Sequence, residues 1–192
     1  MLLLISSLLL MSCGADKYMK KGEKFLALGE YYDAANQFKQ AYTRTPAKER
    51  DTRGKRALKM AQCYQRINAT PKAIAAYRNA IRYNQAAKED QLAYARQLLK
   101  NGDYRQAEKV FLMLKDSMPG NQLVANGLKS AQMAPEWKKQ GSRYIVKRMD
   151  VFNSRRHDYS PVLFGDDYDQ LYFTSTRNEA LGDELSGITG TK

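Results

Sequence analysis

The sequence contains very few of the residues that usually perform catalysis or bind transition metals. It has a single histidine, His157, and two cysteines, Cys13 and Cys63, among 192 residues. No spacing typical of metal ligands links these three residues. The composition therefore argues against a zinc site, against a Cys–His nucleophile pair and against a bound cofactor.

The sequence also lacks a hydrophobic run long enough to cross a bilayer. The longest run, residues 1–11, consists of apolar residues and serine and carries no charged side chain. This length is typical of the hydrophobic region of a signal peptide. The run leads into the sequence Leu10-Met11-Ser12-Cys13-Gly14.

That sequence resembles a bacterial lipobox, with an aliphatic residue three positions before the cysteine and a small residue directly before it. The resemblance implies cleavage before Cys13 and lipidation of Cys13, with several acyl chains giving a firm membrane anchor. We expect a signal peptide over residues 1–12 and a short linker over residues 13–17. Only one acidic residue follows closely, which favours the periplasmic face of the outer membrane. No Lys or Arg precedes the run, and an ordinary signal peptide with a chance cysteine is the alternative.

One pattern of small, aromatic and turn-forming residues occurs three times between residues 18 and 119. The first and third copies are Gly29, Tyr31, Ala34, Phe38, Ala41, Pro46 and Gly102, Tyr104, Ala107, Phe111, Leu114, Pro119. The middle copy is degenerate: Asn68, Thr70, Ala73, Tyr77, Ala80, Gln85. The last two copies lie 34 residues apart and the first two lie 39 apart, which indicates about five inserted residues within 45–55.

A repeat of this length predicts helix–turn–helix units stacked on one another. The alanines allow two helices to approach closely, and the aromatic residue one turn later fills the space between them. The glycines suit a turn with positive φ, and the prolines end the second helix of each unit. The pattern resembles the tetratricopeptide repeat (TPR). A generic helical bundle is the alternative, but it would not place these residues in register.

The resemblance predicts a mainly α fold, a TPR solenoid over residues 18–133. It would contain three helix pairs and a capping helix over 121–133, which Ala134-Pro135 would end before a linker over 134–142. Trp137 would pack the junction rather than stack on a ligand. Cys63 would be a small buried thiol.

The repeats are strongly basic, with 21 basic and 10 acidic side chains in residues 18–119. Residues 52–88 hold nine basic side chains and no acidic one. Either this is a solvated basic surface, or it is a docking site for an acidic segment or an anionic envelope polymer. Nucleic acid is a poor partner for a lipid-anchored protein outside the cytoplasm.

TPR domains bind peptides along a concave face that is lined mainly by the first helix of each repeat. By the family's register, that face would carry Glu23, Leu26, Lys55, Gln62, Arg66, Arg96 and Lys100. Some TPR domains clamp a C-terminal carboxylate with Lys and Asn side chains. Met19, Glu23 and Lys59 occupy those positions here, so we do not expect that ligand.

From Arg143 onward the pattern changes to short β-type runs at residues 144–146 and 151–152, followed by strand, acidic turn and strand over 158–177. This segment resembles a blade of the TolB-like (PD40) β-propellers, through Asp158, Pro161, Phe164, Asp166, Asp167, Phe173, Ser175 and Arg177. The order of the turn residues departs from the motif. Residues 143–192 would be an incomplete, weakly packed blade of a longer protein. The acidic turn lacks the spacing of an EF-hand calcium site.

A lipobox, three TPRs and a propeller blade, in that order, resemble the OmpA-family envelope lipoproteins associated with type IX secretion (the PorE type). The resemblance implies a non-enzymatic outer-membrane lipoprotein that docks envelope or secretion-complex proteins. Peptidoglycan binding would belong to a later domain that this sequence does not contain. The alternatives are a TPR lipoprotein of outer-membrane assembly or nutrient uptake and, less favoured, a propeller-borne hydrolase.

Overall fold

The computed structural model describes residues 2–177, and the side chains of residues 14–177. The chain divides into two units, with the boundary between Gly141 and Ser142. The described part of the first unit consists of helices and short loops, and that of the second contains a two-stranded sheet.

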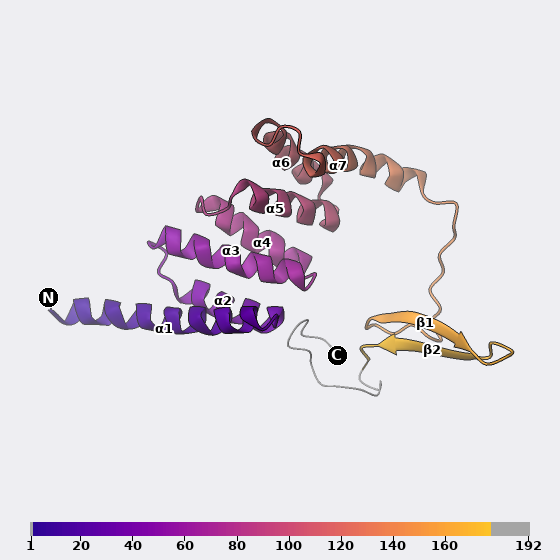
Figure 1. Cartoon of the computed structure of the whole chain (residues 1–192), viewed down its shortest axis with the longest axis horizontal. Coiled ribbons are helices and arrows are strands. Elements are labelled where there is room, and N and C mark those ends of the chain that lie inside the picture. Colours follow the sequence, from indigo (N-terminus) through magenta and orange to yellow (C-terminus); the bar gives the residue numbers. More distant parts are fainter. Residues whose placement is uncertain (1, 178–192) are drawn as a thin grey trace. The chain divides into compact units, whose positions relative to one another are not determined.

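Six helices of the first unit form three helical hairpins, and a seventh helix follows them (Figure 1). The hairpins are α1 (Leu2–Ala27) with α2 (Tyr31–Arg44), α3 (Arg50–Arg66) with α4 (Thr70–Arg82), and α5 (Lys88–Asn101) with α6 (Tyr104–Ser117); α7 is Gln122–Gln140. Each helix packs on the next, and α7 also contacts α5. This stacking agrees with the predicted three helix pairs and one further helix.

The turn inside each hairpin has the same backbone geometry. Gly29, Asn68 and Gly102 occupy equivalent positions and have φ values of 77°, 57° and 84°. The residue after each one donates its N–H to a carbonyl five residues earlier, always at 2.9 Å: Glu30 to Phe25, Ala69 to Tyr64 and Asp103 to Leu98. These bonds satisfy carbonyl groups that the end of a helix leaves open. Asparagine tolerates the left-handed region, so the degenerate repeat keeps the turn.

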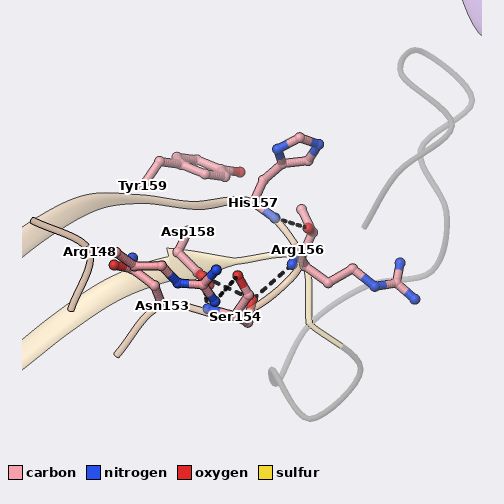
Figure 2. Close-up of a pocket in the computed structure, with 8 residues that line it drawn as sticks. Arg148, Asn153, Ser154, Arg156, His157, Asp158 and Tyr159 are labelled. Atoms are coloured by element: carbon pink, nitrogen blue, oxygen red, sulfur yellow. Dashed lines mark hydrogen bonds between the residues drawn. The ribbon is translucent and has the colours of Figure 1, made fainter. Parts of the chain in front are cut away.

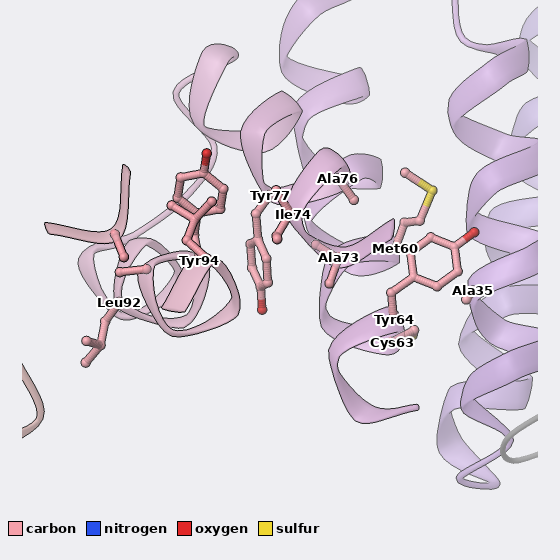
Figure 3. Packing of buried hydrophobic residues seen from close by; sticks show 14 of the residues in the cluster. Ala35, Met60, Cys63, Tyr64, Ala73, Ile74, Ala76, Tyr77, Leu92 and Tyr94 are labelled. Carbon is pink, nitrogen blue, oxygen red and sulfur yellow. The ribbon is translucent and has the colours of Figure 1, made fainter. Parts of the chain in front are cut away.

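The predicted small and aromatic positions belong to one core cluster of the first unit. Figure 3 shows part of this cluster, including Ala73 and Tyr77 of the second repeat. Ala34, Ala73 and Ala107 are fully buried, as are the rings of Phe38 and Phe111, and Tyr77 is almost so. Close packing of this kind is sensitive to a change of even one methylene group.

Two glycines outside the repeat pattern make equally close contacts. A Cβ at Gly22 of α1 would lie 2.6 Å from a ring carbon of Phe38, and one at Gly127 of α7 would lie 2.3 Å from ring carbons of Phe111. Both glycines are buried. The rings of Phe38 and Phe111 therefore occupy space that a Cβ on the facing helix would need.

The predicted linker over residues 13–17 is wrong, because α1 runs through these residues; the leucines of its first half favour helix. The residues inserted within 45–55 lengthen α3, which begins at Arg50 and has 17 residues against 14 for α5. In this additional turn, Arg53 donates to the Thr45 carbonyl oxygen at 2.6 Å and lies 4.4 Å from the ring centre of Tyr42.

The predicted end of the capping helix and the linker over 134–142 are wrong, since α7 passes through Pro135 and ends at Gln140. The proline removes one hydrogen bond, but the residues after it include Glu, Lys and Gln, which favour helix. These residues are exposed, so a local distortion disturbs no packed neighbour. Trp137 is 53% exposed and does not pack a junction as predicted.

The second unit contains the predicted strand, turn and strand. β1 (Asp158–Phe164) pairs antiparallel with β2 (Gln170–Ser175), with an irregularity between Tyr159 and Val162. The predicted strands at 144–146 and 151–152 are wrong, because no strand of the described chain lies beside them to pair their backbone. A single hairpin does not test the β-propeller, which stays a prediction.

Candidate functional site

A hollow of about 670 Å³ lies over the first helices of the three repeats. We call it the A-helix groove. Its lining comes from the five helices α1 to α5: Leu26, Tyr31, Gln62, Cys63, Gln65, Arg66, Tyr77, Glu89, Asp90 and Ala93. The helices α1, α3 and α5 supply most of these residues, which is the arrangement expected for a concave face.

The structure brings together only some of the residues predicted for that face. Leu26, Gln62 and Arg66 line the A-helix groove. Glu23 lies outside the lining and forms an ion pair with Lys59 of α3 at 3.1 Å.

The other three predicted residues extend the face beyond the groove or lie apart from its lining. Lys100 donates to the side-chain oxygen of Asn68 at 2.7 Å, which joins α5 to the turn of the second repeat. Lys55 and Arg96 are exposed and do not line the groove. Lys55 stands seven residues before Gln62, so it lies on the same face of α3, two turns away.

The groove carries charges of both signs, whereas the sequence predicts a basic face. The guanidinium of Arg66 lies 5.8 Å from the ring centre of Tyr31. Opposite charge comes from Glu89 and Asp90 in the first turn of α5, where carboxylates suit the helix dipole. Asp90 accepts hydrogen bonds from the Gln62 side chain at 3.1 Å and from the Ala87 N–H at 3.0 Å.

Sequence reasoning missed the acidic and aromatic residues of the lining. Glu89 and Asp90 directly follow the stretch 52–88, and their place at a helix start was the available signal. Tyr77 was assigned to the core alone, yet its hydroxyl donates to Gln65 at 2.6 Å at the groove. Burial raises the pKa of Tyr77, and the nearby Asp90 carboxylate adds to this effect, so the phenol stays a donor.

The thiol of Cys63 lies at the floor of the groove and is 1% exposed. Burial raises the pKa of Cys63 to about 11, because the thiolate would lose its hydration; Lys59 lowers the pKa and Glu23 raises it slightly. The prediction of a small buried thiol is confirmed.

This burial predicts slow alkylation. In a Cys13→Ala chain at pH 8, Cys63 should react with iodoacetamide about 100-fold more slowly in the folded protein than in urea, since a thiolate pKa higher by two units leaves that much less thiolate. The rate should rise with pH up to about 11. Equal rates in the folded and unfolded chains would contradict the buried position.

A second hollow, in the second unit, surrounds the start of β1 (Figure 2). Asp158 accepts hydrogen bonds from the Ser154 N–H (2.6 Å) and hydroxyl (2.9 Å) and from the Ser175 hydroxyl (2.6 Å). It also pairs with the Arg177 guanidinium at 2.8 Å. These bonds, that of Ser175 foremost, hold the pKa of Asp158 well below its usual range. Three residues of the blade motif thus close the base of the hairpin.

Ser154, His157 and Asp158 do not form a catalytic triad in this hollow. Ser154, His157 and Asp158 line it together. In a catalytic triad the histidine stands between the hydroxyl and the carboxylate. Here the Ser154 hydroxyl donates to Asp158 directly. His157 forms main-chain hydrogen bonds with Thr176: its N–H donates to the Thr176 hydroxyl at 3.0 Å and its carbonyl oxygen accepts from the Thr176 N–H at 2.9 Å. The hydrogen bonds of Asp158 therefore stabilise the base of the β1–β2 hairpin.

Three further features bear on the predictions. Within the described residues, no group of three or more His, Cys, Asp or Glu side chains could hold a metal ion. The Gly165–Asp169 segment is a turn closed by the Tyr168 N–H and the Gly165 carbonyl at 3.2 Å. Over residues 2–177, we find no helix with the length and apolar character needed to cross a membrane.

Known structures resemble the first unit. The first TPR of Spaghetti (RPAP3), bound to the HSP90 peptide SRMEEVD, aligns with a TM-score of 0.52 and 17% identity over 66% of this chain and 96% of that one. The C-terminal TPR-containing domain of a Plasmodium falciparum FK506-binding protein aligns with a TM-score of 0.55 and 15% identity, over 68% and 94%. The first unit has the TPR fold.

This likeness confirms the predicted TPR repeats and their helical solenoid. No protein-family model and none of the curated proteins matches the chain. Because the identities are low, the solved structures define only the fold of the TPR unit. The kind of ligand has to follow from the residues of this chain.

Proposed function

We propose that the protein is a non-enzymatic scaffold that docks partner proteins through the A-helix groove of its TPR unit. The groove itself carries this proposal: it joins three consecutive repeats and offers side chains suited to an extended peptide. Gln62, Gln65 and Tyr77 supply hydrogen-bonding groups, and Leu26 and Ala93 supply apolar surface. One structural relative binds a peptide of the sequence SRMEEVD, which supports a peptide segment as ligand.

The charges favour a segment with an acidic group at one end. Arg66 is exposed and lies at the groove, while Lys59 is held by Glu23. Glu89 and Asp90 at the other side disfavour a uniformly acidic ligand, because like charges repel. We therefore propose a peptide whose acidic residue meets Arg66 and whose polar or basic residues meet α5.

We further propose that Cys13 is lipidated and holds the scaffold at the periplasmic face of the outer membrane, in an envelope complex related to type IX secretion. The lipobox-like sequence supports the anchor. The order of lipobox, TPR unit and β hairpin supports the kind of complex. Peptidoglycan would be reached only through a domain beyond this sequence.

Site-specific cross-linking in the source bacterium tests the docking proposal. A photoreactive amino acid at Gln62, in the groove, should cross-link an envelope protein, and the same group at the exposed Arg78 of α4 should not. Arg66→Glu should reduce the Gln62 adduct about tenfold, since it replaces the cation that meets the acidic residue of the peptide by a like charge that repels it. Mass spectrometry of the native chain should find acylated Cys13.

The matched control is Arg78→Glu, which makes the same charge change on an exposed residue outside the groove. It should leave the adduct unchanged. Identical adducts from both positions, or equal losses in the two charge variants, would rule out the groove as the docking surface. An unmodified Cys13 would rule out the anchor and leave the groove result standing.

A further inference from the structure

Four lysines follow one another along the outer side of α1. Lys17, Lys20, Lys21 and Lys24 have the spacing that places side chains on a single helix face. All four are exposed, and together they line a shallow hollow. We call them the α1 lysine stripe.

The stripe faces away from the solenoid. Among residues 14–27 of α1, the buried residues are Ala15 and Gly22, which lie on the opposite side of the helix; α1 packs against α2. Because α1 is the first helix of the stack, no repeat of the described chain covers its outer side. The lysine stripe is thus an end surface of the solenoid.

The charge of the stripe is not neutralised within the described chain. None of the ion pairs found among residues 14–177 includes these four lysines. Asp16 lines the same hollow, but its carboxylate pairs with the buried Arg56. Four like charges along one helix repel one another, so an anionic surface opposite them would relieve this repulsion.

Apolar side chains accompany the stripe. Leu28 lies one turn beyond Lys24 on the same face and is 72% exposed. Phe25 is half-buried, and the ammonium group of Lys21 lies 5.6 Å from its ring centre. A face that combines lysines with an exposed leucine is typical of helices that lie at a membrane interface.

We propose that the α1 lysine stripe docks the TPR unit onto the anionic headgroups of a lipid bilayer. The ligand is the membrane surface, recognised through phosphate charge, with Leu28 entering the interface. The position of the stripe fits this role, because Lys17 stands four residues after Cys13, about 6 Å along a helix. Attraction between basic side chains and an anionic membrane acts over a Debye length of about 8–10 Å.

Vesicle sedimentation of the full chain carrying Cys13→Ala, to which no acyl chain is attached, tests this proposal. The chain should bind vesicles containing phosphatidylglycerol more tightly than vesicles of phosphatidylcholine alone. Replacing the four lysines by glutamine should weaken binding to the anionic vesicles about tenfold or more. Raising the salt concentration from about 0.1 M to about 0.5 M should also weaken the binding of the parent chain to the anionic vesicles.

Two variants complete the test. The matched control replaces four exposed basic residues outside α1 by glutamine, Arg78, Arg105, Lys109 and Lys129, and should bind like the parent. Replacing the four lysines by arginine keeps the charge and should also bind like the parent, which separates charge from folding.

Several results would overturn the proposal. These are equal binding to both kinds of vesicle, an equal loss in the control variant, or no loss when the four lysines are replaced by glutamine. Binding to polyglutamate without binding to vesicles would instead assign the stripe to an acidic protein. Because every variant leaves the A-helix groove intact, failure here does not affect the docking proposal.

Discussion

Phe111→Ala is expected to lower the free energy of unfolding of the TPR unit by about 3–5 kcal/mol, the usual loss for truncating a buried phenylalanine. The ring is fully buried in α6 and touches the backbone position of Gly127 in α7. Its removal leaves a cavity between two helices. Because repeats of this kind contact mainly their neighbours, the loss should appear first in α5, α6 and α7.

Urea unfolding followed by circular dichroism measures this effect, and hydrogen exchange locates it. The neighbouring residue provides the control, since Leu112 is 44% exposed. Leu112→Ala should change the free energy of unfolding by less than about 1 kcal/mol. A similar loss of unfolding free energy in the two variants would contradict the buried position of Phe111.

Gly22→Ala is expected to destabilise the TPR unit by about 1–3 kcal/mol, although alanine favours helix more than glycine does. The added methyl group would lie 2.6 Å from a ring carbon of Phe38, which is fully buried and has no free space to move into. A methyl group at this distance forces α1 and α2 apart.

Gly14 in the same helix is the matched control. A Cβ there would meet no atom within 4 Å, so Gly14→Ala should leave stability unchanged or raise it by up to about 1 kcal/mol. Combining Gly22→Ala with Phe38→Leu should restore part of the loss, because the smaller side chain makes room. Equal stability of the Gly22→Ala and Gly14→Ala variants would contradict the close contact between Gly22 of α1 and the Phe38 ring of α2.

The helical hairpins were predictable because their signals are local. A left-handed residue at Gly29 or Gly102, or a proline after the second helix, determines where the chain turns whatever surrounds it. The predicted helix end at Pro135 and the predicted strand at residues 144–146 were wrong because these outcomes are not decided locally. Their outcome depends on neighbours: α7 continues where nothing packs against it, and a β-type run stays irregular without a partner strand.

The groove was less predictable because its charge depends on pairing between repeats. The basic stretch 52–88 ends one residue before Glu89, and the fold brings Glu89 and Asp90 to the same hollow as Arg66. Lys59 is held by Glu23, 36 positions earlier in the chain. A charge count along the sequence cannot show which cations such contacts neutralise.

The unbroken course of α1 limits how far the scaffold can reach. Ala15, two residues after Cys13, is already 2% exposed within the solenoid, so an anchor at Cys13 would have no flexible tether. The first groove residue, Leu26, follows Cys13 by about 20 Å along the helix axis. Because this part of α1 has a fixed length, it selects partner proteins by their distance from the anchor as well as by their sequence. Only a segment presented within a few nanometres of the anchor could enter the groove, and lengthening α1 by whole helical turns would move the groove away from the anchor in steps.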